Sequence, residues 1–192
     1  MLSARGNGRS PATRGFTLLE LLVVVVVMGL LTAVLAPQVI GRLSEGQGAA
    51  LHAQLSRLSA ALLAHRQDVG RYPRTLRQLS LAPAAGSRDS CNRPYAGGIF
   101  DRWKGPYIDR EIPASGLPVG SSVVRDAIRR DPAGYSETGT LLIDVTGVDR
   151  EIADQLEQSL DGNANPGAGT VRWTDTGAGQ GTLTYAVLAR GC

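Results

Sequence analysis

The sequence contains little of what a catalytic or metal site requires. Its 192 residues include only two cysteines and two histidines. The histidines, His52 and His65, stand 13 residues apart without cysteines or paired carboxylates at ligand spacing, which is not the pattern of a metal site. Nucleophile-elbow and glycine-rich phosphate-loop sequences are also absent. The sequence therefore predicts a protein that is not an enzyme, with both histidines at solvated helix positions.

A strong charge imbalance is absent as well. Three of the 20 basic side chains lie in residues 1–15, which hold no acid, so the rest of the chain carries 17 charges of each sign. The formal net charge of +3 therefore belongs to the first 15 residues. Because an excess of basic side chains is the usual signature of nucleic-acid binding, we expect no nucleic-acid partner.

The sequence does contain one long apolar run, residues 21–41, without an ionisable side chain. As a helix this run would be about 30 Å long, which matches the hydrocarbon core of a bilayer. The valines at 23–27 favour a strand in water, but in lipid a helix satisfies the backbone. Basic residues before the run favour a cytoplasmic N-terminus. We therefore expect residues 16–41 to cross the inner membrane once, with the N-terminus in the cytoplasm and the residues after 41 in the periplasm.

A single carboxylate, Glu20, lies at the start of this apolar segment. An unpaired charge in hydrocarbon costs on the order of several kcal/mol. The charge of Glu20 therefore has to be neutralised, either by a proton or by a cation nearby. The alternative is that Glu20 simply lies in the headgroup region at the start of the helix.

The residues around Glu20 resemble the prepilin leader of the type IV pilin superfamily. Residues 14–20 (RGFTLLE) end a basic leader at Gly15 and place Phe16 first and Glu20 fifth in the mature chain. The resemblance implies that a prepilin peptidase and N-methyltransferase removes residues 1–15 and methylates the amine of Phe16. It also implies the remaining partners, namely other pilin or pseudopilin subunits, an inner-membrane assembly platform and membrane lipid. In a staggered filament, Glu20 of one subunit would then meet the Phe16 amine of another.

The helix is expected to continue beyond the apolar run. Pro37 removes one backbone hydrogen bond and permits a kink, and the superfamily also has a proline at this place. Residues 42–69 then predict an amphipathic half with a leucine stripe on one face. The stripe consists of Leu51, Leu55, Leu58 and Leu62. A helix over residues 16–68 would be about 80 Å long, and we expect its stripe to pack on a globular head.

Residues 70–192 are expected to form this head, in an α+β fold whose small antiparallel sheet packs against the long helix. Proline and glycine make residues 71–118 rich in loops. Within them, residues 70–73 and 103–108 resemble the loop after the long helix in the major pseudopilin of type II secretion systems. The last third predicts strands over 140–145, 170–174 and 182–188 and a helix over 149–160.

Cys91 and Cys192 are the only cysteines, so their pairing is fixed if a disulfide forms. Disulfides persist in an extracytoplasmic domain. Closing a loop of about 100 residues stabilises a fold by up to roughly 4.7 kcal/mol in the chain-entropy model. We expect the Cys91–Cys192 bond, and the alternative is two unpaired thiols.

Oxygen side chains stand at alternate positions in one loop, at Asp161, Asn163 and Asn165, as they do in calcium loops. However, Pro166 and Arg172 occupy the sixth and twelfth positions, where an EF-hand has glycine and glutamate. Major pseudopilins bind calcium in their C-terminal region, so the resemblance retains these three residues as a calcium candidate. From the residues themselves we expect a helix end followed by an Asx turn, and no cofactor.

The resemblance implies a structural subunit of a type IV pilus-like filament, and most closely a pseudopilin of a type II secretion system. One alternative is a minor type IV pilin that acts in adhesion, DNA uptake or motility. A second is a periplasmic enzyme or binding domain on a membrane anchor, whose function would not depend on Phe16 or Glu20. A third is a secreted protein cut after the small residues at 32–36, whose mature chain would begin near Pro37.

Overall fold

The computed structural model describes residues 16–131, 139–163 and 165–189, with the backbone alone for residues 34–43. The chain divides into two compact units, Met1–Gly41 and Arg42–Cys192. The first helix, α1 (Leu18–Val69, 52 residues), contributes to both units. The predicted long N-terminal helix is therefore confirmed to within two residues at each end.

The described part of the first unit is the beginning of α1. Thr17 caps this helix, because its Oγ1 accepts a hydrogen bond from the backbone N–H of Glu20 at 3.2 Å. Within the described residues, no helix combines the length and the apolar character needed to cross a membrane. The expected crossing by residues 16–41 is therefore not confirmed. The predicted kink at Pro37 lies outside the described side chains.

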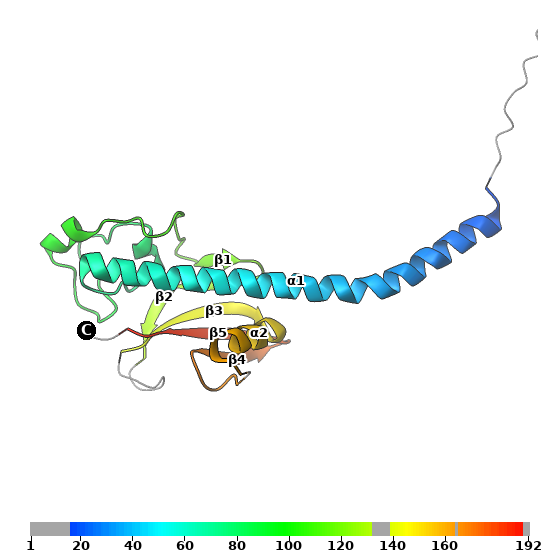
Figure 1. Cartoon of the computed structure of the whole chain (residues 1–192). Helices are drawn as coiled ribbons and strands as arrows, with labels where there is room; N and C mark the ends of the chain where they lie inside the picture. The colour runs from blue at the N-terminus through cyan, green and yellow to red at the C-terminus, as the bar shows by residue number, and fades with distance from the viewer. Residues whose placement is uncertain (1–15, 132–138, 164, 190–192) are drawn as a thin grey trace, which may run out of the picture. The chain divides into compact units, whose positions relative to one another are not determined.

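In the second unit, the last part of α1 packs along a sheet (Figure 1). The four leucines of the stripe are buried, and none exposes more than 2% of its surface. They share one hydrophobic core with sheet residues such as Ile143, Val145 and Leu183. Because fully burying one leucine contributes about 1.5–3 kcal/mol, the stripe holds the helix on the head. The predicted packing of the leucine stripe is confirmed.

Five strands form one antiparallel sheet in the described part of the chain, in the order β1-β2-β3-β5-β4. They are β1 (Leu117–Val119), β2 (Ser122–Arg130), β3 (Leu141–Asp149), β4 (Val171–Gly177) and β5 (Gln180–Val187). The last three match the predicted strands, and the α+β fold is as expected. The β4–β5 hairpin places β5 between β3 and β4.

The sequence does not predict β2. Charged side chains at positions 125, 126, 129 and 130 interrupt the alternation of apolar and polar residues by which a half-buried strand is recognised. Strict alternation after Val124 would bring Asp126 to the core face, but the register with β3 shifts between Val124 and Ile128. Such an irregularity re-aims side chains locally, and Asp126 Oδ1 accepts the backbone N–H of Arg77 at 2.7 Å.

The second helix, α2 (Arg150–Asp161), follows β3 directly and buries the apolar face that the sequence predicts. It ends at Gly162, whose φ of 72° is in the left-handed region that favours glycine. The α2 helix comes close to α1 at Gly48. A Cβ added at Gly48 would lie 2.6 Å from Gln155 Oε1, so a larger residue there would displace the glutamine.

Residues 70–116 contain two 3-10 helices, η1 (Leu76–Leu79) and η2 (Gly97–Arg102), and are otherwise loops, as predicted. A fully buried carboxylate, Asp89, holds part of this region. Its Oδ1 accepts the backbone N–H groups of Cys91 and Arg93, both at 2.9 Å. Because these backbone N–H groups bond to the buried carboxylate, Asp89 holds the surrounding loop in place.

Candidate functional site

The candidate site is the beginning of α1 together with Phe16 just before it, a segment that carries most of the exposed large apolar side chains among the described residues. Its large apolar side chains are all exposed, from 42% for Val24 to 83% for Leu18. They are Phe16, Leu18, Leu19, Leu21, Leu22, Val23, Val24, Val25, Val26, Val27, Met28, Leu30 and Leu31. Contiguous apolar surface of this kind marks a site of interaction with protein or membrane.

Glu20 is the one charged side chain that the structure describes in this segment. It stands in the first turn of α1, where the helix N-terminus favours a carboxylate by about 0.3–1 kcal/mol. Within the described residues, Glu20 makes no ion pair. This exposed carboxylate can therefore receive a cation from another molecule.

Of the two residues at the predicted cleavage site, the structure describes only the second, Phe16. Phe16 is 76% exposed and comes just before the helix. Gly15 and the leader lie outside the described residues. Cleavage after Gly15 and methylation of the Phe16 amine therefore stay predictions.

Cys91 lies in the loop that Asp89 organises. It is disulfide-bonded, and no cysteine is free in the described ranges. Nη1 of Arg130 approaches its Sγ to 3.0 Å. The predicted partner, Cys192, lies outside the described residues, so the pairing itself stays a prediction.

Asp161, one of the three calcium candidates, uses its carboxylate to hold the loop after α2. Its Oδ1 accepts the backbone N–H of Thr170 at 2.8 Å, and its Oδ2 accepts that of Val171 at 2.9 Å. Neither carboxylate oxygen is therefore free of the loop's own hydrogen bonds. Such a carboxylate acts as a clamp between the helix end and β4.

The other two calcium candidates also bond within the loop. Asn165 Oδ1 accepts the backbone N–H of Gly167 at 3.2 Å, which is the predicted Asx turn. The side-chain amide of Asn163 donates to the backbone carbonyl of Asp161 at 3.2 Å. Among the residues that the structure describes, no group of three or more His, Cys, Asp and Glu side chains could hold a metal ion. Calcium binding by these three residues stays a prediction, and in this structure they bond within the loop.

His65 is not solvated, so that prediction is wrong. It is fully buried, and its Nδ1 lies 2.9 Å from the carbonyl oxygen of Arg71. A carbonyl only accepts, so Nδ1 carries the proton. Burial lowers the pKa of His65 from 6.5 to about 4, which keeps the ring neutral at pH 7. Its position continues the spacing of Leu58 and Leu62, and that signal in the sequence would have placed it in the core.

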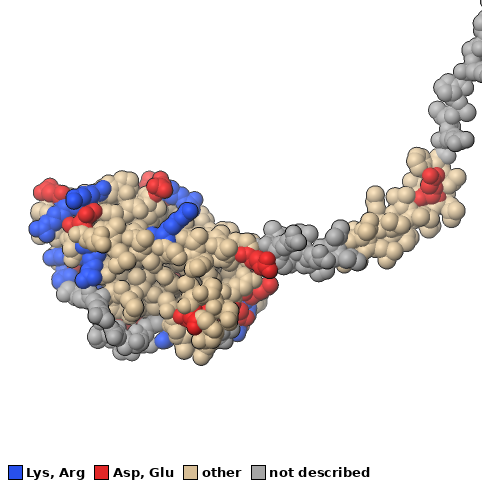
Figure 2. Space-filling view, in the orientation of Figure 1, with Lys and Arg blue, Asp and Glu red and all other residues tan. Residues whose placement is uncertain are grey.

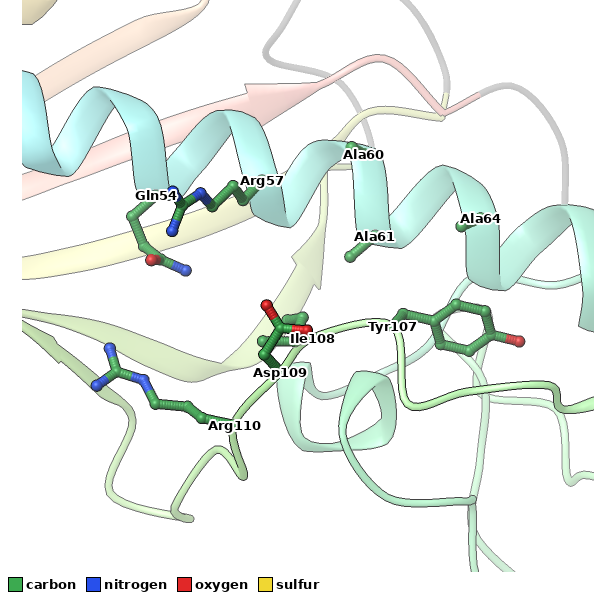
Figure 3. A pocket seen from close by; sticks show the side chains of 9 residues that line it. All are labelled: Gln54, Arg57, Ala60, Ala61, Ala64, Tyr107, Ile108, Asp109 and Arg110. Carbon is green, nitrogen blue, oxygen red and sulfur yellow. The ribbon is translucent and has the colours of Figure 1, made fainter.

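A groove of about 740 Å³ lies beside α1 in the second unit (Figure 3). Ala60, Ala61 and Ala64 line it from the helix, and residues 107–110 line it from a loop. The hydroxyl of Tyr107 already donates to Asp68 Oδ2 at 3.0 Å. None of the nine lining residues is a histidine, serine or cysteine. The groove therefore lacks the nucleophile and base of an acyl-transfer site, and the alternative of a periplasmic enzyme gains no support from it.

The sequence matches two family models. Residues 11–36 match the prokaryotic N-terminal methylation motif, and residues 38–117 match protein G of the type II secretion system. The likeness to prepilins around Glu20 and to pseudopilins in the loop region is therefore confirmed. Strands β2 to β5 lie beyond both matches.

The curated relatives carry two names, a core protein of type II secretion and a type IV major pilin. The "Type II secretion system core protein G" of Klebsiella pneumoniae is 34% identical over 89 residues, which cover 46% of this chain and 64% of that protein. The protein of the same name from Pseudomonas aeruginosa is 38% identical over 61 residues, or 32% and 43% of the two chains. The "Type IV major pilin protein PilA" of Myxococcus xanthus is 29% identical over 109 residues, or 57% and 49%. The chain thus spans less than two thirds of each of these relatives. No solved structure matches it.

Proposed function

We propose that this chain is a structural, non-enzymatic subunit of a type IV pilus-like filament, and specifically a pseudopilin of a type II secretion system. One observation carries the proposal: α1 begins with exposed apolar side chains and a lone carboxylate, in the segment that matches the N-terminal methylation motif. Apolar surface exposed to water is driven to pack against other apolar surfaces. The same segment of neighbouring subunits supplies such a surface in a filament.

The proposal assigns the same segment a role before assembly. Membrane lipid of the inner membrane covers the apolar start of α1, and the head lies in the periplasm. Prepilin peptidase then cuts between Gly15 and Phe16 and methylates the new amine. This amine is a cation, and Glu20 of a neighbouring subunit neutralises it, because opposite charges attract strongly in an apolar surrounding. An inner-membrane assembly platform and other pilin-like subunits complete the list of partners.

The experiment that tests this function replaces Glu20 in the native host. Glu20→Val is expected to leave the protein cleaved and bound to the membrane but absent from filaments sheared from cells. Leu22→Val is the matched control, since it changes an exposed side chain two residues away without altering charge, and it is expected to assemble like the wild type. Normal incorporation of Glu20→Val would show that the carboxylate is dispensable.

A type IV pilin is the second candidate. The match to the Myxococcus pilin favours it, since that match covers 57% of this chain against 46% for the Klebsiella protein G. Deleting the chain separates the two functions. Loss of protein export with surface pili intact supports the pseudopilin, and loss of pili, adhesion or DNA uptake with export intact supports the pilin.

A further inference from the structure

Charge is distributed unevenly over the second unit. Among the coloured groups in Figure 2, blue ones outnumber red ones at one end of this unit, and red ones outnumber blue ones at the other end, where Figure 1 places α2. Residues 57–118 carry ten basic and five acidic side chains, whereas residues 149–161 carry one basic and five acidic ones. The proposed function does not by itself account for this separation.

The basic end contains an ordered set of arginines, here called the arginine cluster: Arg71, Arg74, Arg88 and Arg93. Nε of Arg93 lies 3.0 Å from the Oδ2 of buried Asp89, and Nη1 of Arg71 lies 3.6 Å from it. Asp89 is the one carboxylate within ion-pair distance of the cluster among the described residues. Two of the four guanidinium groups therefore face this carboxylate, and the cluster as a whole carries an excess of positive charge.

The other two arginines of the cluster are held by an asparagine. Nη1 of Arg74 donates to Asn92 Oδ1 at 2.6 Å, and Nη1 of Arg88 donates to the backbone oxygen of Asn92 at 2.7 Å. A guanidinium has five N–H donors, so these bonds fix the side chains while most donors remain for an external anion. Arginine held in this way is suited to bidentate binding of carboxylates.

The acidic end presents three carboxylates, here called the acidic patch: Glu45, Glu151 and Asp154. The Oγ of Ser44 donates to Glu151 Oε1 at 3.1 Å, so the start of α2 lies beside Glu45 on α1. Asp154 also forms an ion pair with Arg150, whose Nε lies 2.8 Å from Asp154 Oδ1. Glu45 and Glu151 are both exposed.

The two surfaces are far apart on one molecule. Ser44, at the acidic patch, and Val69, next to the arginine cluster, are 25 residues apart on α1. This separation corresponds to about 38 Å of helix. One copy therefore cannot pair its own cluster with its own patch, whereas two copies can.

We infer that the arginine cluster of one copy of this chain binds the acidic patch of the next copy, an inference that rests on the proposed filament function. Two different, complementary surfaces on identical subunits make a head-to-tail contact, and such a contact repeats into a helical filament instead of closing as a symmetric dimer. The apolar start of α1 supplies the affinity. The charge pairs fix the register, since exposed ion pairs contribute only about 0–1 kcal/mol each and act mainly on partner selection.

Charge reversal tests the pairing in full-length protein expressed in the native host. The basic reversal is Arg74→Glu with Arg88→Glu, which leaves the contacts of Asp89 intact. The acidic reversal is Glu45→Arg with Glu151→Arg. Each reversal alone is expected to lower filament yield at least 10-fold. Co-expression of the two variants, or all four changes in one chain, is expected to restore most of the yield, because every contact is then again between opposite charges.

Two controls keep the result specific. Arg125→Glu with Asp175→Arg reverses the same number of charges outside the cluster and the patch and is expected to assemble normally. Thermal unfolding of each variant checks that its head remains folded. Wild-type assembly of both reversals, or failure without mutual restoration, overturns the pairing. Failure of the basic reversal alone would indicate a different anion, such as a lipid phosphate, and also overturns it. None of these outcomes depends on Glu20, so the filament function is judged separately by Glu20→Val.

Discussion

The two parts of α1 are both rich in large apolar residues but differ in their surroundings. In the first unit, every large apolar side chain that the structure describes is exposed, whereas in the second unit the leucine stripe is buried against the sheet. Apolar surface without a partner is unstable in water. The first part therefore requires another molecule, and the second part finds its partner in the same chain. In the proposed filament, one helix thus serves both assembly and the stability of the head.

Matched leucine truncations are expected to give the largest contrast between the two parts. Leu58→Ala removes a fully buried side chain, and we expect it to lower the free energy of unfolding of the head by about 2–5 kcal/mol. Leu22, which is 54% exposed, is expected to change this free energy by less than about 0.5 kcal/mol when truncated to alanine. Urea unfolding of the full chain in detergent, followed by circular dichroism, measures both. Equal losses would contradict the division of α1 into two roles.

His65, which is buried in the second part of α1, makes the stability of the head depend on pH. Above pH 6.5 the ring is neutral in both the folded and the unfolded chain. Between pH 6.5 and about 4 the unfolded chain binds a proton that the folded chain does not, so stability is lost as the pH falls through this window. A pKa lowered from 6.5 to about 4 corresponds to about 3 kcal/mol in total.

The matched test of this pH dependence replaces each histidine by glutamine. His65→Gln is expected to remove most of the loss between pH 6.5 and 4, measured as the change in the urea midpoint. His52→Gln, at a half-buried position, is expected to keep the wild-type profile. An unchanged profile in His65→Gln would show that other groups cause the acid sensitivity.

The Asp161 clamp is expected to have a smaller effect. Asp161→Asn replaces a charged acceptor of two backbone N–H groups and is expected to cost about 1.5–3 kcal/mol of stability. Asn163→Ala, in the same loop, is expected to cost less than about 1 kcal/mol. Because the Asp161 oxygens are engaged by the loop, adding calcium or a chelator should leave the melting temperature of the wild type unchanged. A rise in melting temperature with calcium that Asp161→Asn abolishes would overturn this account of the loop.

The smallest expected difference is between glutamine substitutions of Glu157 and Glu20, measured as the free energy of unfolding. Glu157 is fully buried, and its carboxylate oxygens find no hydrogen-bond partner among the described residues. Burial, together with the charge of Asp154, raises the pKa of Glu157. The folded chain therefore holds this proton more tightly than the unfolded chain, so the contribution of Glu157 to stability is present at low pH and is lost as the pH rises through the raised pKa.

Glu157→Gln is accordingly expected to raise the free energy of unfolding at pH 8 by on the order of 0.5 kcal/mol, since the new amide also lacks partners. The gain should disappear at acid pH. Glu20→Gln, in the exposed part of α1, should leave unfolding unchanged and affect assembly alone. A loss of stability at pH 8 in Glu157→Gln would show that the carboxylate has a stabilising partner.

The sequence predicts those elements whose signals are local. The leucine stripe, the three C-terminal strands and α2 follow from periodicity, and Gly162 marks the end of α2. Strand β2 is not predicted, because its charges and its register shift depend on contacts with η1 and β3. The burial of His65 is missed because a histidine on a helix is usually exposed, and here a distant loop covers it.

Some residues of the candidate sites can be recognised from the sequence, and others only from the fold. Phe16 and Glu20 are recognised from a motif of consecutive residues. The arginine cluster cannot be recognised from spacing, because residues 71 to 93 become neighbours only when Asp89 and Asn92 close the loop. In the calcium candidate, by contrast, the sequence spacing suggests a site. Its side-chain oxygens alternate in the sequence as they do in calcium loops, but in the fold those of Asp161 and Asn165 accept backbone hydrogen bonds.

The most direct test of the assembly role of α1 is N-terminal mass analysis of the full protein extracted from the membranes of its host. Removal of residues 1–15 and an N-methylated Phe16 are the predicted result, because the cation that Glu20 requires is created by that cleavage. An intact Met1, or a mature chain that begins near Pro37, would contradict the account.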